Sequence, residues 1–199
     1  MNSVSLPSAF LLVISLLFFA GCATYRSGRQ SDDGPPESGA GFALGVVEFD
    51  DQGKVWNRDD ADRILEVARR EAEKGGATIV VFIHGWHHSA RAGDANLVDF
   101  RKALLKLKTE MDAPIYRSAR GRLVGHEDAT LIGVYIGWRG RSLPGFLDYL
   151  TFWDRKPAAE RVGRGDVVEL LSTLDRIWID SNQRDLYTGL ITIGHSFGA

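Results

Sequence analysis

The chain has very little cysteine and almost no excess of charge of either sign. Cys22 is the only cysteine among 199 residues, so no disulfide forms within the chain, and no zinc-type spacing of Cys and His is present. The 24 basic and 26 acidic residues nearly balance, which removes the usual electrostatic reason to expect a nucleic-acid partner. We also find no internal repeat. The composition therefore predicts one ordinary globular domain without a nucleic-acid partner.

The N-terminal apolar run is too short to cross a membrane comfortably. It covers Phe10–Ala20, the length of a signal-peptide core, and leads through Gly21 into Cys22. Small residues directly before a lone cysteine resemble the lipobox of bacterial lipoproteins. The resemblance implies cleavage before Cys22, a diacylglyceryl group on its sulfur and a lipid anchor in the cell envelope. Because Ala23 follows, it implies the periplasmic side of the outer membrane in a host with two membranes.

Two features depart from the lipobox pattern. Residues 2–10 contain no Lys or Arg, and Phe19 stands where leucine is more usual. The alternatives are a cleaved secretory signal with an incidental cysteine, and an uncleaved anchor. Residues 23–41 are rich in Ser, Gly, Pro and Asp and bury too little apolar surface to order themselves. We expect a signal peptide over 1–21, a flexible tether over 22–41 and a folded domain over 42–199.

Apolar, β-branched segments alternate with amphipathic segments throughout the expected domain. Such alternation predicts an α/β fold, with a mostly parallel sheet and helices on both faces. The expected strands are Phe42–Phe49, Thr78–Ile83, Thr130–Ile136 and Leu190–Ile193, with a further strand beginning at Lys54–Trp56. The expected helices are Asp59–Lys74, Asn96–Met111 and Ala158–Ile179. The aromatic side chains of Arg141–Pro157 indicate a short helix packed on the core by those groups.

The strand expected at Leu190–Ile193 runs directly into Gly194-His195-Ser196-Phe197-Gly198. Its wholly apolar sequence indicates burial on both faces. A G-x-S-x-G sequence directly after a strand resembles the nucleophile elbow of the α/β-hydrolase family, a strained turn that lifts a serine hydroxyl clear of the sheet. Gly194 and Gly198 suit such a turn because a side chain at either position would collide with neighbouring backbone. The alternative is a glycine-rich turn without catalytic meaning.

A second motif lies upstream, where the strand Thr78–Ile83 ends in His84-Gly85. An apolar strand ending in His-Gly resembles the oxyanion-loop strand of the same family. By this resemblance, Ser196 is the nucleophile and the backbone N–H groups of Trp86 and Phe197 form the oxyanion hole. The supporting loop residues are His84, Gly85, Gly194 and Gly198. The same resemblance implies the alternative that Arg141–Pro157 is a lid over the substrate pocket. Both motifs follow the carboxyl ends of strands, where ligands of α/β sheets bind, so we expect one shared site.

Three histidines, His84, His87 and His88, follow one strand closely. The spacing of His84 and His88 would suit a metal on a helix, but this segment is expected to be a loop, and no acidic residue lies within the cluster. We therefore predict no metal ion and no cofactor. The expected arrangement is that His84 hydrogen-bonds the loop while the other two line its mouth.

The resemblance implies a membrane-anchored serine hydrolase of esterase or lipase type, acting on small-molecule or lipid esters. In this family the catalytic acid and histidine follow the serine, whereas three residues follow Ser196 here. We therefore expect residues 42–199 to be the N-terminal part of a hydrolase domain, C-terminally incomplete and inactive alone, with an apolar edge on the last strand. The alternatives are a non-catalytic binding module with a hydrolase fold, and an acyltransferase.

Overall fold

The computed structural model describes residues 37–39, 41–114, 129–140, 152–184 and 186–199. They form a five-stranded sheet in the order β1-β2-β4-β3-β5, in which β1 runs antiparallel to β2 and every other pair is parallel. The strands are β1 (Glu37–Ser38), β2 (Phe42–Phe49), β3 (Ala77–Ile83), β4 (Thr130–Trp138) and β5 (Gly189–Gly194). The mostly parallel sheet is thus confirmed. Cys22, the segment around it and most of Arg141–Pro157 lie outside the described residues.

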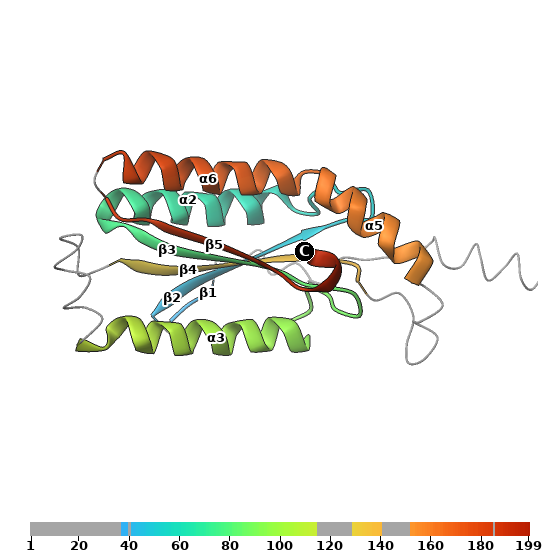
Figure 1. Ribbon diagram of the computed structural model, residues 1–199, viewed down its shortest axis with the longest axis horizontal. Coiled ribbons are helices and arrows are strands. Elements are labelled where there is room, and N and C mark those ends of the chain that lie inside the picture. The colour runs from blue at the N-terminus through green and yellow to red at the C-terminus, as the bar shows by residue number, and fades with distance from the viewer. Residues whose placement is uncertain (1–36, 40, 115–128, 141–151, 185) are drawn as a thin grey trace, which may run out of the picture.

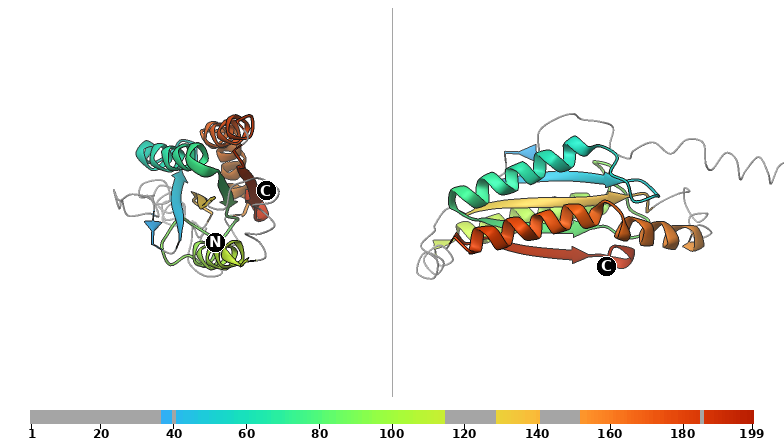
Figure 2. Two further views of the ribbon diagram at one scale, coloured as in Figure 1. Left: turned by 90° about the vertical axis from the view of Figure 1, so that its left-hand side faces the viewer. Right: turned by 90° about the horizontal axis from the view of Figure 1, so that it is seen from above.

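Helices cover both faces of this sheet (Figures 1 and 2). One face carries α2 (Arg58–Gly75) and α6 (Val167–Asn182), with α5 (Phe152–Arg164) leading into α6, and the other face carries α3 (Ala95–Asp112). Consecutive residues of β3 supply the two cores, because Ile79 and Val81 pack with the α2 and α6 side while Val80 packs with the α3 side. No helix within the described ranges is both long and apolar enough to cross a membrane.

The last strand lies at the edge of the sheet. β5 pairs with β3 alone among the described strands, and Ile191 and Ile193 are 50% and 44% exposed. The prediction that this strand is buried on both faces is therefore wrong, because an apolar run does not distinguish a central strand from an edge strand. The expectation of an exposed apolar edge agrees with the structure.

The helix expected over Ala158–Ile179 is in fact two helices, separated at Gly165 and Asp166. Gly165 packs directly on the turn after β2, where an added Cβ would lie only 2.2 Å from the carbonyl oxygen of Gly53. The N–H of Asp166 donates to that same oxygen at 2.8 Å. The chain therefore bends to meet a segment more than 100 residues earlier.

The expected strand at Lys54–Trp56 is also absent from the described sheet. Val55 forms only an isolated antiparallel bridge with Phe49, and its N–H donates to the carboxylate of Asp166 at 3.2 Å. The same carboxylate accepts a hydrogen bond from Nζ of Lys54 at 2.9 Å. The segment still pairs locally with the end of β2, because the N–H of Trp56 donates to the carbonyl oxygen of Glu48 and the N–H of Asp50 to that of Lys54, both at 2.8 Å. Contacts with the start of α6 accompany this short pairing.

Charged side chains meet where β2 and β4 end. Asp51 contacts the guanidinium groups of both Arg139 and Arg155, accepting from Nη1 of Arg155 at 3.0 Å. Arg155 is only 2% exposed, and it also donates to the carbonyl oxygen of Arg139 at 3.2 Å. Asp51 therefore joins α5 to the carboxyl end of the sheet.

Candidate active site

Ser196 has a backbone conformation that non-glycine residues rarely adopt. It lies one residue beyond His195, which follows the end of β5, and it opens a short 3-10 turn, η2 (Ser196–Gly198), with a φ of 56°. A serine in the left-handed region is strained and persists only where its surroundings enforce it. One such constraint is the N–H of His195, which donates to the carbonyl oxygen of Ile83 at 3.0 Å. The predicted elbow is therefore a tight, strained turn held against the end of β3.

The glycines of both motifs allow backbone segments to touch. A Cβ at Gly198 would lie 2.4 Å from the carbonyl oxygen of Ile83, and a Cβ at Gly194 would lie 2.5 Å from Cα of Ala199. A Cβ at Gly85 would lie 2.7 Å from Cβ of Ser196. None of these positions accepts a side chain without displacing its neighbours. The structure thus places Gly85 directly beside Ser196, as the sequence predicts.

The two residues expected to supply oxyanion donors are also neighbours. The rings of Trp86 and Phe197 stack with centroids 6.0 Å apart and an interplanar angle of 22°. Trp86 lies in the loop after β3, and Phe197 is the residue after Ser196. The two segments that would carry the oxyanion hole therefore pack side by side next to the serine.

His84 is a fully buried link between the ends of β3 and β4. Its Nε2 accepts the N–H of Trp138 at 2.9 Å, and its Nδ1 lies 2.9 Å from the carbonyl oxygen of Gly85. Because Nε2 accepts, the proton is on Nδ1, which donates to Gly85. The Trp138 indole N–H donates in return to the carbonyl oxygen of His84 at 2.8 Å. The expectation that His84 hydrogen-bonds the loop agrees with these contacts.

Burial lowers the pKa of His84 from 6.5 to about 4. The folded state therefore binds this proton less readily than the unfolded chain does. The contribution of neutral His84 to the free energy of unfolding is complete above pH 6.5 and is lost as the pH falls towards 4. We expect the free energy of unfolding to fall by about 3 kcal/mol over that range through this group. Urea unfolding at several pH values measures it.

The matched variant for this measurement is His84→Gln, which keeps a donor and an acceptor but does not titrate. Its free energy of unfolding should depend on pH less steeply than that of the wild type. Between pH 6.5 and 4 the variant should take up one proton fewer on unfolding. Identical slopes for the two proteins would show that His84 does not titrate on unfolding.

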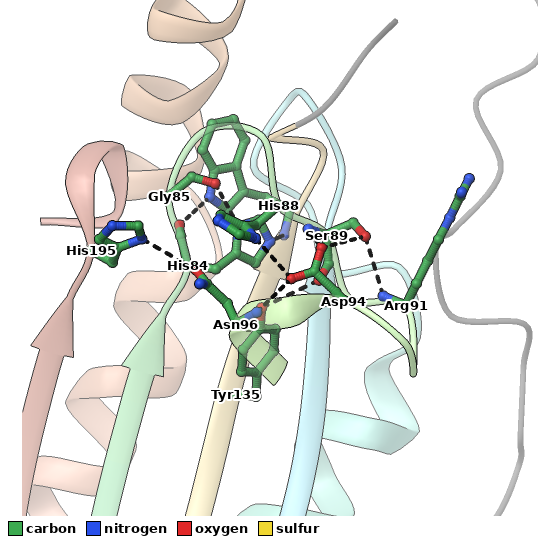
Figure 3. A network of polar contacts seen from close by, with 10 residues as sticks. His84, Gly85, His88, Ser89, Arg91, Asp94, Asn96, Tyr135 and His195 are labelled. Carbon is green, nitrogen blue, oxygen red and sulfur yellow. Dashed lines mark hydrogen bonds and ion pairs between the residues drawn. The ribbon is translucent and has the colours of Figure 1, made fainter. Parts of the chain in front are cut away.

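His87 and His88 are both held by contacts in the loop that follows β3. His87 has a φ of 70°, stacks on Trp86 with centroids 3.9 Å apart, and donates from its N–H to the carbonyl oxygen of Gly140 at 3.1 Å. Nδ1 of His88 lies 2.9 Å from Oδ1 of Asp94, the N-cap of α3 (Figure 3). Within the described part of the chain, no three His, Cys, Asp or Glu side chains are grouped so as to hold a metal ion.

The contacts of α3 with this loop and with the elbow were not predicted from the sequence. Besides His88, Asp94 binds Ser89, and Asn96 lies 3.2 Å from Nδ1 of His195 (Figure 3). An Asp just before an amphipathic segment is a signal for a helix N-cap. That signal indicates where α3 begins, but it does not reveal the contacts with histidines on two other segments.

A cavity of about 400 Å³ opens on the α5 side of Ser196. Its walls come from η2, from the ends of β3 and β4, and from α5 and the start of α6. They include Ile83, Trp138, Ala159, Val162, Ser196 and Phe197, with Lys156, Glu160 and Arg164 also present. The elbow is therefore closed by Gly85 on one side and open on the other.

Comparisons with protein-family models, with curated proteins and with solved structures gave no match.

Proposed function

We propose that this chain carries the nucleophile and the oxyanion hole of an α/β-hydrolase-type serine hydrolase acting on ester-like acyl substrates. The observation that carries the proposal is the strained turn at Ser196, with its φ of 56° directly after a parallel strand and its contact with Gly85. Non-glycine residues rarely adopt a positive φ without a constraint that enforces it. A nucleophile elbow is such a constraint, because its tight turn would present the serine hydroxyl at the carboxyl edge of the sheet.

The proposed reaction is acyl transfer to water. Oγ of Ser196 attacks the carbonyl carbon of the ester, and its proton passes to a histidine that an acidic residue orients. The N–H groups of Trp86 and Phe197 stabilise the oxyanion. The alcohol leaves with a proton, and water then hydrolyses the acyl-enzyme to release the acid and free Ser196.

In the hydrolase family that this proposal invokes, the histidine that acts as general base comes later in the chain than the serine. Three of the described histidines have other hydrogen-bond partners: His84 contacts Gly85 and Trp138, His88 contacts Asp94, and His195 contacts Asn96. The proposed lipid anchor at Cys22 would hold the enzyme at a membrane surface. Lipid esters are therefore included among the proposed substrates.

A fluorophosphonate probe tests the proposal, because it reacts with activated serine nucleophiles. We expect the native protein, produced from its own gene, to be labelled at Ser196, as located by mass spectrometry of its peptides. Heat-denatured protein should not react. A folded protein that resists labelling would contradict the proposal and would favour the non-catalytic binding module.

A further inference from the structure

Asp94 holds the loop that follows β3. Its carboxylate accepts four hydrogen bonds: from Nδ1 of His88 at 2.9 Å, from the N–H and Oγ of Ser89 at 2.9 and 3.3 Å, and from the N–H of Asn96 at 2.9 Å. The carboxylate is only 11% exposed. Hydrogen bonds to a partly buried carboxylate are among the stronger ones in proteins. Asp94 thus ties the loop carrying Trp86 to the first turn of α3.

Asn96 holds the elbow from the same turn of α3. Its Oδ1 lies 3.2 Å from Nδ1 of His195, the residue before Ser196. An amide oxygen only accepts, so Nδ1 of His195 donates. The rings of His195 and His88 are also close, with centroids 5.9 Å apart. One turn of one helix therefore binds both segments that flank the serine.

The loop has further contacts with β4. The buried hydroxyl of Tyr135 donates to the carbonyl oxygen of Ser89 at 3.3 Å. Burial, and then the charge of Asp94, raise the pKa of this hydroxyl, so it remains a neutral donor. On the opposite side of the loop, a Cβ at Gly140 would lie 2.6 Å from the carbonyl oxygen of Gly85. These β4 contacts hold the loop but do not involve the elbow, whereas α3 contacts both segments. The loop and the elbow also touch directly, through the ring pairs Trp86–Phe197 and His88–His195.

We propose that Asp94 and Asn96 are positioning residues of the oxyanion hole. Each fixes one of its two halves, Asp94 the loop with the N–H of Trp86 and Asn96 the turn with the N–H of Phe197. Both anchors belong to one helical turn, so α3 constrains the spacing of the two donors in addition to the direct contact between Trp86 and Phe197. This inference rests on the proposed function, since a displaced donor matters only if an oxyanion forms between them.

The test compares Asp→Asn changes at two positions of α3 in the native protein. Asp94→Asn can keep the helix-capping oxygen that accepts from the N–H of Asn96. It then replaces Oδ2, the acceptor for Ser89, with an NH2 donor that opposes the N–H of Ser89. Asp99→Asn is the matched control, because Asp99 pairs with Lys102 and both side chains are about 70% exposed. At the elbow, Asn96→Ala removes the contact with His195 and Asn96→Asp retains an acceptor.

The expected result is that Asp94→Asn and Asn96→Ala each lower kcat for ester hydrolysis by about 10- to 100-fold while KM changes little. Asp99→Asn and Asn96→Asp should stay near the wild type. Equal kcat values for Asp94→Asn and Asp99→Asn would overturn the proposal for Asp94. An Asn96→Asp variant as slow as Asn96→Ala would overturn it for Asn96.

Amide hydrogen exchange separates this inference from the proposed function, because it requires no activity. Exchange at residues 86–89 should become at least about tenfold faster in Asp94→Asn, and exchange at 195–197 should do so in Asn96→Ala. Faster exchange in a protein that neither hydrolyses esters nor reacts at Ser196 would support the positioning contacts and refute the hydrolase. Unchanged exchange would refute the positioning role even in an active enzyme.

Discussion

Ester hydrolysis by the native protein is expected to fall by at least about 10⁴-fold in kcat when Ser196 is replaced by alanine. The reason is that the acyl-enzyme cannot form without Oγ, and only the oxyanion hole and substrate binding remain to accelerate attack by water. Release of p-nitrophenol from p-nitrophenyl butyrate measures the rate. KM should change little, because the hydroxyl contributes mainly to the transition state.

The matched control is Ser172→Ala, which makes the same chemical change on α6, away from the elbow. It should retain the wild-type rate. If Ser196→Ala kept more than about a tenth of the wild-type kcat, another residue would be the nucleophile. The strained turn would then be a structural feature of the edge strand.

The second large effect is expected from Asp51→Ala, which should lower the free energy of unfolding by about 3 kcal/mol or more. Asp51 contacts Arg139 and the nearly fully buried Arg155. Removing the carboxylate leaves two positively charged guanidinium groups close together and incompletely hydrated, and both effects destabilise the folded state. Guanidinium chloride unfolding, followed by tryptophan fluorescence, measures the loss.

A surface ion pair provides the comparison for Asp51. Glu66 and Arg69 pair on α2 with side chains 65% and 47% exposed, so Glu66→Ala should cost less than about 1 kcal/mol. Added salt should reduce that small effect further and change the Asp51 effect much less. Equal losses for the two variants would show that the buried cluster contributes no more than a surface pair.

The central part of the fold was predictable because its strands are buried on both faces. β2 has the bounds that its apolar pattern predicts, and β3 begins only one residue earlier than expected. A predominantly apolar run is a clear signal where both faces of a strand meet helices. The same signal failed for β5, since the pattern of Leu190–Ile193 carries no information on whether a further strand lies alongside.

The division between α5 and α6 was not predictable from local pattern. Gly163 and Gly165 weaken a helix in any context, but the chain turns at Gly165 because Gly53 lies against it. Such a contact joins residues far apart in the sequence, and no local window contains both. The contacts of Asp51 with Arg155 were missed for the same reason.

The candidate site was predictable in outline. Its two motifs both follow parallel strands, so their neighbouring positions follow from the fold class, and Gly85 does lie beside Ser196. The contribution of α3 was not predictable. Asp94 and Asn96 read as ordinary residues at a helix start, and their contacts with His88 and His195 exist only once three separate segments have met.

The pairing of β3 with β5 has a consequence for the order in which the molecule folds. The N–H of Ala77 donates to Oγ1 of Thr188, a residue 111 positions later in the chain. Likewise, β2 pairs with β4, which follows it only after α2, β3 and α3. Closing such large loops costs entropy before the contacts compensate for it, so folding should be slow for a domain of this size. Because synthesis proceeds from the N-terminus, β3 presents an open edge until the elbow has emerged from the ribosome. A nascent chain therefore holds every helix described here before it holds a candidate active site.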